Sequence, residues 1–410
     1  MKRKIFTGIM VFLTALLPAS GITYVKASEE SAAVDDVTEE DVNVDKEANI
    51  LSSAKLTDLI AAKKNTENVM LSPTSLNFAL GMLAQGAKGE TADALKTYLG
   101  TDDFAAYAKN YLEKIQDYNV ESDQDSQYQS KLKIADAIWA DQELPLNAEF
   151  KKKVTDYFNS EVTNLDFSDT EETCKKINDW CDQNTEGLIP EIITPDSINK
   201  DTGLCLTNSL YFESAWSGDP WTVSEDEETF GDTGETTHYM TSSGEQYYEN
   251  DKATAFGRSY ANGLSFIGIL PNKDGDFTLD DLDIYSLLKS TPEYDEVYCK
   301  MPKLNFETSA TLSEELQSLG LENIFSSDAD FSGITDTNTK VGSILQKTKL
   351  ELDENGTKAA AVTAIMVESC AAPAADPVIK EVYLTRPFAF LIYDSINDEI
   401  LFMGKVITVK

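Results

Sequence analysis

The chain has 410 residues, and its 71 acidic and 34 basic side chains give a formal net charge of −37 at pH 7. So acidic a surface repels nucleic acid and anionic lipid, and neither is an expected partner. The single histidine, His238, excludes a zinc hydrolase built on paired histidines and leaves a Ser–His or Cys–His hydrolase with one candidate base.

The N-terminus has the pattern of an export signal. A basic patch at Lys2–Lys4 precedes an apolar run over Ile5–Leu17, and small residues follow up to Ala27. This run is too short to span a membrane, so we expect residues 1–27 to be a cleaved signal peptide and the protein to be secreted, with no membrane span. Residues 1–27 contain four basic residues, Lys2, Arg3, Lys4 and Lys26, and no acidic one. Their removal lowers the net charge to 30 − 71 = −41.

The next segment is strongly acidic. Ser28–Glu47 contains nine acidic residues and one lysine, so residues 28–48 are predicted to be a disordered tether. Beyond it we find no Pro/Gly/Ser-rich linker and no internal repeat. Length alone would allow two or three domains, but we predict a single domain over residues 49–410.

Helical signals concentrate in the first half of this domain. Ser72 is a candidate N-cap followed by Pro73, and apolar residues then recur at helical spacing until Gly86. A second helix is predicted to end at Leu99. Further helices are predicted over residues 149–160, over 170–185, and from about Leu312 to Leu319 with a stop at Gly320.

Strand signals dominate the second half. Strands are predicted, in chain order, over residues 68–71, 131–141, 202–216, 263–271, 296–307, 346–353 and 379–408, the last with a hairpin turn at 395–399. Helices followed by strands indicate an α+β fold in which helices pack on large mixed or antiparallel sheets. Between the last two strand regions lies a segment of small and apolar residues.

The cysteines predict neither a disulfide nor a metal site. Cys174 and Cys181 are seven residues apart in a predicted helix, about 10.5 Å of rise, which exceeds disulfide reach. Cys205 lies in an apolar strand and is expected to be buried. His238 lies in a polar, strand-like stretch, and no G-x-S-x-G motif is present, so we expect no enzyme and no cofactor. A catalytic carboxylate pair remains possible, although no pattern singles one out.

Six motifs, in the right order, resemble the serpin family over nearly the whole mature domain. They are Asn68, Ser72, Pro73, Ser75, Gly86 and Thr91; Thr207–Phe212 with Trp216; Met301–Leu304; Ala329–Ile334; Glu354–Thr363; and Arg386–Leu391 with Phe402–Val406.

The resemblance implies a serpin fold with a reactive-centre loop over about residues 354–380. In the family's inhibitors a serine or cysteine protease cleaves this loop and becomes acylated. The freed segment then inserts as a new strand of the main sheet and traps the enzyme as a covalent 1:1 complex. The implied hinge residues are Glu354, Gly356, Thr357, Ala359, Ala360, Ala361 and Thr363. The alternative is a non-inhibitory binding protein on the same fold.

The resemblance also implies residues that support the inserting strand. They are Ser72, Ser75, Asn208, Trp216, Lys303 and Gln346. Lys303 and Glu354 match a charge pair of the family, so we predict a contact between them. Gln346 stands where the family usually has histidine, Lys358 where it usually has glutamate, and Ser214 where it usually has glycine.

The segment itself fits an inserting strand. Side chains of a strand alternate between its faces. One face carries Thr357, Ala359, Ala361, Thr363, Ile365 and Val367, which are small or apolar, whereas both charges, Lys358 and Glu368, lie on the other. The only N-x-[ST] sequon begins at Asn355, where a glycan would obstruct insertion.

The family's usual span of about 14 residues from the hinge glycine to the scissile bond implies cleavage between Cys370 and Ala371. Counting back from Pro387 would place the bond near Asp376 instead. Small side chains suit the shallow pocket of elastase-like or subtilisin-like proteases, and no Arg or Lys lies between Lys358 and Lys380. We therefore expect a secreted, monomeric inhibitor of such enzymes.

Overall fold

The computed structural model shows an α+β fold and describes residues 44–120, 129–198, 202–357 and 377–410. These residues belong to one unit that spans Val42–Lys410. The expected signal peptide, most of the tether and the Cys370–Ala371 bond lie outside the described residues. The first helix begins at Lys46, so the last three residues of the expected tether, 46–48, are helical.

Side-chain caps explain where several helices begin. Asp45, Ser72, Asp103, Asn147 and Asp169 each accept a hydrogen bond from a backbone N–H of the first turn that follows, which satisfies a donor left free at a helix start. The helices are α1 (Lys46–Lys64), α2 (Pro73–Ala84), α3 (Gly89–Leu99), α4 (Phe104–Lys114), α5 (Ala148–Phe158), α6 (Thr170–Asn184), α7 (Ile284–Leu288) and α8 (Ser313–Leu316).

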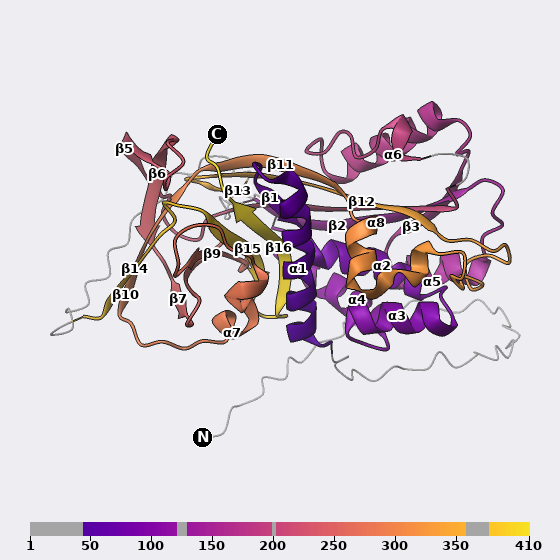
Figure 1. The fold of residues 1–410 in the computed structure, drawn as a ribbon, viewed down its shortest axis with the longest axis horizontal. Coiled ribbons are helices and arrows are strands. Elements are labelled where there is room, and N and C mark those ends of the chain that lie inside the picture. Colours follow the sequence, from indigo (N-terminus) through magenta and orange to yellow (C-terminus); the bar gives the residue numbers. More distant parts are fainter. Residues whose placement is uncertain (1–43, 121–128, 199–201, 358–376) are drawn as a thin grey trace, which may run out of the picture. The chain divides into compact units, whose positions relative to one another are not determined.

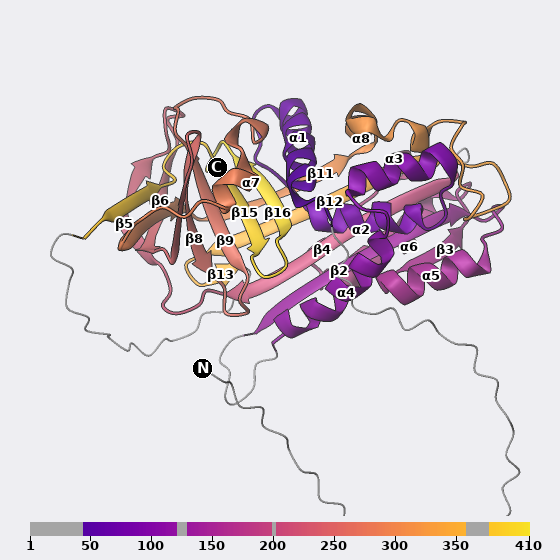
Figure 2. The same cartoon turned by 90° about the horizontal axis from the view of Figure 1, so that it is seen from below.

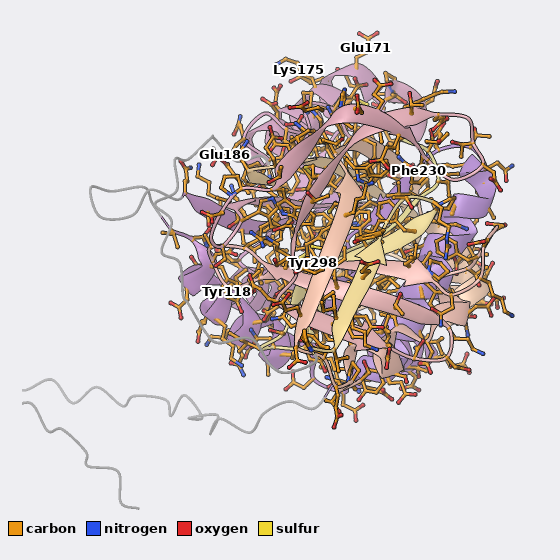
Figure 3. All side chains as sticks on the ribbon, turned by 90° about the vertical axis from the view of Figure 1, so that its left-hand side faces the viewer. Tyr118, Glu171, Lys175, Glu186, Phe230 and Tyr298 are labelled. Atoms are coloured by element: carbon orange, nitrogen blue, oxygen red, sulfur yellow. The ribbon has the colours of Figure 1, made fainter. Side chains whose placement is uncertain are left out.

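The strands form three sheets. The first has the order β1 (Val69–Leu71), β16 (Glu399–Val406), β15 (Phe388–Asp394), β9 (Ser265–Pro271), β8 (Ala253–Ser259) and β7 (Gln246–Glu249). The second has the order β14 (Ile379–Tyr383), β10 (Glu296–Pro302), β6 (Thr236–Ser243) and β5 (Thr222–Thr229), and Figure 3 faces it. The third, here the central sheet, has the order β11 (Leu304–Thr311), β12 (Val341–Asp353), β13 (Gly356–Thr357), β4 (Leu204–Ala215), β2 (Ser130–Asp141) and β3 (Glu161–Leu165).

The central sheet lies between two layers of helices (Figures 1 and 2). On one face Cys174, Ile177 and Cys181 of α6 pack in one buried cluster with Trp139 and Cys205 of the sheet. Helix α2 covers the other face, where alternate residues such as Leu206 and Leu210 join the main core. The alternation of side chains along β4 therefore separates the two cores.

Two sequence predictions are changed in detail. The strand predicted over residues 296–307 is two strands: β10 ends at Pro302, and after Lys303 the chain continues as β11 in a different sheet. The helix predicted to end at Gly320 is regular only over α8, and a wider turn carries it to Leu321. Gly320 there has φ +97°, the left-handed conformation expected of a helix stop.

The predicted burial of Cys205 is confirmed, and the described cysteines form no disulfide. Cys174, Cys181, Cys205 and Cys299 are free and buried. Burial raises the pKa of Cys205 to about 11 and that of Cys181 to about 12, so both are unreactive thiols at neutral pH. His238 is exposed, and its Nδ1 lies 3.0 Å from the carbonyl oxygen of Ser224. Among the described helices none is long and apolar enough to cross a membrane.

Candidate functional site

The central sheet is split between β4 and β12. These two strands pair directly, in parallel, only up to the pair Gln346↔Asn208. Beyond that pair β12 continues to Asp353 and β4 to Ala215, and at this far end the short strand β13 lies between them. β4 and β12 thus stop pairing directly after Asn208 and Gln346, and at the end near Ala215 and Asp353 the strand β13 lies between them. We call the interval in between the seam; it runs along residues 347–351 of β12 and 209–213 of β4.

Strand β13 is the beginning of the predicted hinge. Gly356 pairs with Asp353 and with Ala215, and Thr357 pairs with Leu352 and with Ser214, both antiparallel. Gly356 has φ +148°, and a Cβ there would lie 2.3 Å from the carbonyl oxygen of Ser214. Only glycine fits this position.

Thr357 points inward. Its side chain is buried, with 4 % of its surface exposed, and its hydroxyl lies 2.7 Å from the Tyr260 hydroxyl. Tyr260 is itself buried, stacks on Trp216 at 4.5 Å between ring centroids, and has its pKa raised by burial. The buried hydroxyl of each residue therefore satisfies the other. This burial agrees with the inward face predicted for Thr357.

The turn that leads into β13 is held by backbone hydrogen bonds. Trp216 donates its backbone N–H to Asn355 O at 2.9 Å and its indole N–H to Asp353 O at 3.0 Å. Trp221 donates its backbone N–H to Glu354 O at 2.9 Å. Trp216, predicted only as a support residue, thus fixes both ends of the turn between β12 and β13.

The predicted contact between Lys303 and Glu354 is confirmed. Lys303 follows β10 at the point where the chain changes sheets, and its ammonium group pairs with the Glu354 carboxylate. The hydrogen bond from Lys303 lowers the pKa of Glu354. Their side chains are 44 % and 30 % exposed, so the pair contributes at most about 1 kcal/mol and chiefly positions the turn.

A buried polar cluster marks the end of the seam where β4 and β12 join. Gln346 accepts from Ser72 N–H at 2.9 Å and donates its amide to Ser72 O at 2.9 Å and to Asn208 Oδ1 at 2.5 Å. Asn208 donates to Leu345 O at 3.2 Å. One amide side chain thus ties Ser72, the N-cap of α2, to both strands, and an amide does not titrate.

Asp136 belongs to this cluster, although it was missed in the sequence. It stands opposite Asn208 on β2 and is 2 % exposed. Its Oδ1 accepts from the Ser75 hydroxyl at 3.1 Å, and burial raises its pKa well above the ordinary value. The sequence did carry a signal for Asp136: it is the one acidic residue in the otherwise apolar stretch 134–140. A carboxyl buried in such a strand must be hydrogen-bonded or protonated, so it indicates a polar partner in the core.

Ser214, which replaces the family's glycine, has a partner. Its hydroxyl lies 2.8 Å from the Ser130 hydroxyl on β2, and both residues are buried. The substitution therefore adds a side-chain link between β4 and β2 beside the place where β13 enters.

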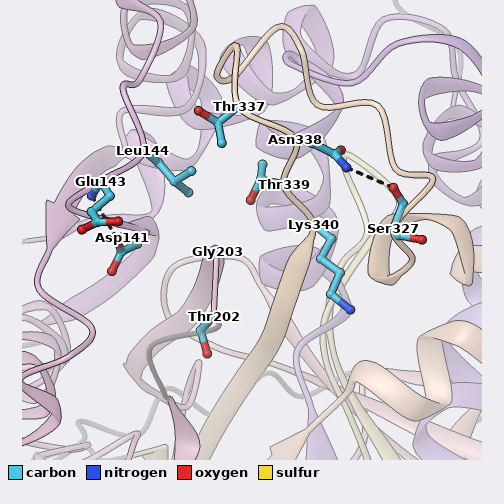
Figure 4. Close-up of a pocket in the computed structure, with 10 residues that line it drawn as sticks. All are labelled: Asp141, Glu143, Leu144, Thr202, Gly203, Ser327, Thr337, Asn338, Thr339 and Lys340. Atoms are coloured by element: carbon cyan, nitrogen blue, oxygen red, sulfur yellow. Dashed lines mark hydrogen bonds between the residues drawn. The ribbon is translucent and has the colours of Figure 1, made fainter.

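A pocket lies where β4 and β12 begin, at the end opposite β13 (Figure 4). It has a volume of about 430 Å³ and is lined by Asp141, Thr202, Gly203, Thr339 and Lys340 among others. A Cβ on Gly203 would lie 2.2 Å from the Thr339 hydroxyl oxygen, so glycine lets the residues that precede β4 and β12 approach closely here.

The described hinge residues are therefore brought together with the support residues. Glu354, Gly356 and Thr357 lie beside Trp216 and Lys303. Ser72, Ser75, Asn208 and Gln346 form the polar cluster at the end of direct β4–β12 pairing. Ala359, Ala360, Ala361 and Thr363, like Cys370 and Ala371, lie outside the described residues. No group of three or more potential metal ligands occurs within the described ranges.

Comparison with known proteins agrees with this architecture. The family profile described as "Serpin (serine protease inhibitor)" matches residues 47–409. An uncharacterized serpin-like protein of Thermococcus kodakarensis is 32 % identical over 84 % of this chain and 82 % of its own length. Serpin-ZXA of Oryza sativa subsp. japonica is 31 % identical over 83 % of this chain and 90 % of its own.

Solved structures show the same fold. The native-state crystal structure of the thermophilic serpin tengpin is 29 % identical to this chain and aligns with a TM-score of 0.73. The alignment covers 90 % of this chain and 95 % of that one.

Proposed function

This chain belongs to the serpin family, whose members are generally protease inhibitors, and we propose that it is a secreted suicide inhibitor of elastase-like or subtilisin-like serine proteases. In this proposal, cleavage at Cys370–Ala371 frees the segment after β13. The segment fills the seam between β4 and β12 while the protease is still acylated, and no catalytic residue or cofactor of this chain is required.

The observation that carries the proposal is the register of β13. Extended without a break, the pairing Thr357↔Ser214 and Thr357↔Leu352 brings residue 363 opposite both Asn208 and Gln346. These two residues are themselves the last direct pair of β4 with β12. Both sides of the seam thus accept one continuous strand in one register.

The same register agrees with the chemistry of the segment. Ala359 would lie opposite Leu350 and Phe212, and Ala361 opposite Thr348 and Leu210, all of which are buried. Small side chains on this face of the new strand would enter the core without displacing the large ones.

The register also accounts for Lys358. It would lie between Glu213 of β4 and Glu351 of β12, on the outer face of the sheet. A lysine there meets two carboxylates, whereas the glutamate usual in the family would be repelled by both. Lysine at position 358, in place of the family's usual glutamate, therefore suits the two acidic residues that would flank it.

The length of β4 supports the forward count to the scissile bond: the seam would accept residues 358–362, and β4 and β12 would have to separate along their present direct pairing to accept 363–367. If the register of β13 continued, residues 358–367 would lie opposite the stretch from Glu213 to Leu204, and Ser369 would lie opposite Thr202, which lines the pocket of Figure 4. Cys370 then follows just past the end of β4. A bond near Asp376 would leave several residues beyond the sheet.

Covalent trapping tests the proposal. The protein is mixed with pancreatic elastase or subtilisin, and the products are separated by denaturing electrophoresis after boiling. We expect a band at the summed mass of the two proteins less the C-terminal peptide, and a released peptide that begins at Ala371. Trypsin and thrombin should form no complex, because the segment from 359 to 379 contains no Arg or Lys. A peptide that begins beyond Pro373 would refute the assigned bond.

The non-inhibitory alternative predicts a different result. A binding protein on this fold would be cleaved in its loop without forming a complex and without the gain in stability that strand insertion brings. Export is tested independently: secreted material should begin at or near Ser28, after removal of residues 1–27.

A further inference from the structure

The turn that leads into the hinge contains a chemically labile pair of residues. Asn355 is followed by Gly356, and the chain has one other Asn–Gly pair, Asn262–Gly263. In such a pair the backbone nitrogen of the glycine can attack the side-chain amide carbon of the asparagine, because glycine has no side chain to hinder the approach. Asparagine is accordingly one of the thermolabile residues of proteins. The two pairs can be compared within one molecule.

The carboxamide of Asn355 is unrestrained by its surroundings. Asn355 is half-buried in the turn between β12 and β13. Its main chain is held, because its N–H donates to Asp353 Oδ1 at 2.7 Å and its carbonyl oxygen accepts from Trp216 N–H at 2.9 Å. No hydrogen bond joins its carboxamide to any residue in the described ranges. The carboxamide can therefore turn toward the Gly356 nitrogen without losing a hydrogen bond to these residues.

At the other pair both reacting groups are held. The Asn262 carboxamide donates to Tyr118 O at 3.4 Å and accepts from Leu264 N–H at 3.3 Å. The Gly263 N–H donates to Tyr260 O at 3.0 Å. Tyr260 and Leu264, on either side of the pair, are both buried. Attack at Asn262 would have to break all three hydrogen bonds, so this pair is the matched control that the chain itself offers.

The Gly356 nitrogen is held only by the pairing of β13. Gly356 pairs with Asp353 and with Ala215, and in this closed state its nitrogen stays in line with the strand, away from the Asn355 side chain. Strand β13 has only two residues, so few pairs must break for it to leave the sheet. Such local openings are far more frequent than global unfolding. The attack therefore proceeds from the open hinge.

We propose that Asn355 is a site of spontaneous covalent modification, in which the Gly356 nitrogen closes a succinimide ring and water opens it to aspartate or isoaspartate. The bond from Gly356 N to Asn355 Cγ forms, and the bond from Cγ to the amide nitrogen breaks. That nitrogen leaves as ammonia with the proton from the Gly356 N–H. Water then adds to either ring carbonyl, so the net change is one ammonia lost and one water gained.

Either product disturbs the entry of β13. Isoaspartate lengthens the main chain by one atom before Gly356, at a place so tight that even a Cβ would lie 2.3 Å from the Ser214 carbonyl oxygen. Aspartate adds a third carboxylate after Asp353 and Glu354, and the Lys303 ammonium is already paired with Glu354. Modification should therefore convert an inhibitor into a substrate. This consequence rests on the proposed function, whereas the chemistry does not.

The test follows the full-length protein, made without a glycan on Asn355 because a glycan would block the attack. The protein is incubated at about 37 °C and pH 8, and peptide mass spectrometry with isoaspartate methylation quantifies Asn355 and Asn262 in the same samples. Asn355 should convert about tenfold or more faster than Asn262, because only its hinge opens locally. An Asn355 that stays unchanged, or equal rates at the two pairs, would overturn the proposed site.

Variants connect the chemistry to the hinge. Thr357→Arg, which should expel β13, should speed conversion of Asn355. Asn355→Gln removes the five-membered ring, so its starting inhibitory activity should persist while that of the unaltered protein falls in parallel with conversion. Equal loss of activity in both proteins would overturn the effect on the hinge.

The loop-cleaved protein separates this inference from the proposed function. Insertion would make β13 part of a longer strand paired on both sides, so conversion should slow about tenfold or more. Equal rates in cleaved and intact protein, or absence of covalent trapping by fresh protein, would count against the proposed function. Neither result alters the conversion measured at Asn355 in the intact protein, which alone decides whether the site exists.

Discussion

Thr357 is the first residue that commits the hinge to the sheet, and Thr357→Arg tests that role. The side chain is 4 % exposed and lies between Ser214 and Leu352, with its hydroxyl 2.7 Å from that of Tyr260. The described surroundings contain no acid directed at it, since Glu354 is already paired with Lys303. Because Thr357 is already buried in the intact protein, an arginine should expel β13 from the sheet, and it would be buried without a partner when the strand entered again on insertion.

The cost can be stated from these contacts. Loss of the hydroxyl leaves Tyr260 unpaired, at about 1–3 kcal/mol, and burial of an unpaired charge adds several kcal/mol. Even about 3 kcal/mol placed on the insertion step slows it more than a hundredfold, because each 1.36 kcal/mol is a factor of ten in rate. Hydrolysis of the acyl-enzyme is unaffected, so it overtakes insertion.

The assay is the number of inhibitor molecules consumed per protease molecule inactivated. We expect Thr357→Arg to be cleaved at the ordinary rate and to inactivate almost no enzyme. Thr357→Val is the matched control: it removes the hydroxyl, at a cost of about 1–3 kcal/mol, without adding charge, and its efficiency should fall between those of the unaltered protein and Thr357→Arg. An arginine variant that traps protease with unchanged stoichiometry would show that the register of β13 is not the register of insertion.

Three further changes test other parts of the account. Gly356→Ala should expel β13, because its Cβ would lie 2.3 Å from the Ser214 carbonyl oxygen. The number of inhibitor molecules consumed per protease inactivated should then rise, as for Thr357→Arg. An unchanged number would show that β13 does not depend on glycine at this position. In Lys358→Glu the new carboxylate would lie between Glu213 and Glu351, so the loop-cleaved form should lose about 1 kcal/mol of stability. The melting temperature of the intact form should not change. A shift in both forms would argue against this pairing. Burial raises the pKa of Asp136, so its protonation favours folding fully below the ordinary value of 3.8, and this contribution is lost as pH rises toward the folded pKa. Asp136→Asn should therefore raise the melting temperature more at pH 8 than at pH 4; an equal shift at both would refute the protonated assignment.

The sequence predicted the parts of the site that short motifs encode. The hinge, the Lys303–Glu354 contact and the cluster around Gln346 follow from local patterns and their resemblance to a family. The helix α2 followed from its cap at Ser72 and the spacing of its apolar residues.

Other parts depend on contacts between distant segments. Tyr260 lies 97 residues before Thr357 in the chain, and no local pattern connects the two. Strand β5 was missed because most of its residues are exposed, which removes the alternation that marks a half-buried strand. Helix α4 was missed although Phe104, Ala108 and Tyr111 recur at helical spacing after the cap Asp103, a signal that was present and overlooked.

The break after Pro302 has a physical reason that sequence reading did not supply. Residues 296–307 carry an apolar residue at every second position on either side of Pro302 and Lys303, so they were read as a single element. Proline lacks the N–H needed to continue a ladder, and the chain passes from β10 to β11 across Lys303. That corner places Lys303 beside the hinge.

The central claim is that the segment after β13 completes the central sheet when the loop is cut, and thermal unfolding of intact and loop-cleaved protein measures this directly. Insertion would add about ten residues paired on both sides, at a net gain on the order of 10 kcal/mol. For a domain of about 360 residues such a gain corresponds to an increase in melting temperature on the order of 10 °C. We expect the cleaved protein to melt at least that far above the intact form. Equal melting temperatures would show that the strand does not insert and would contradict the inhibitory mechanism.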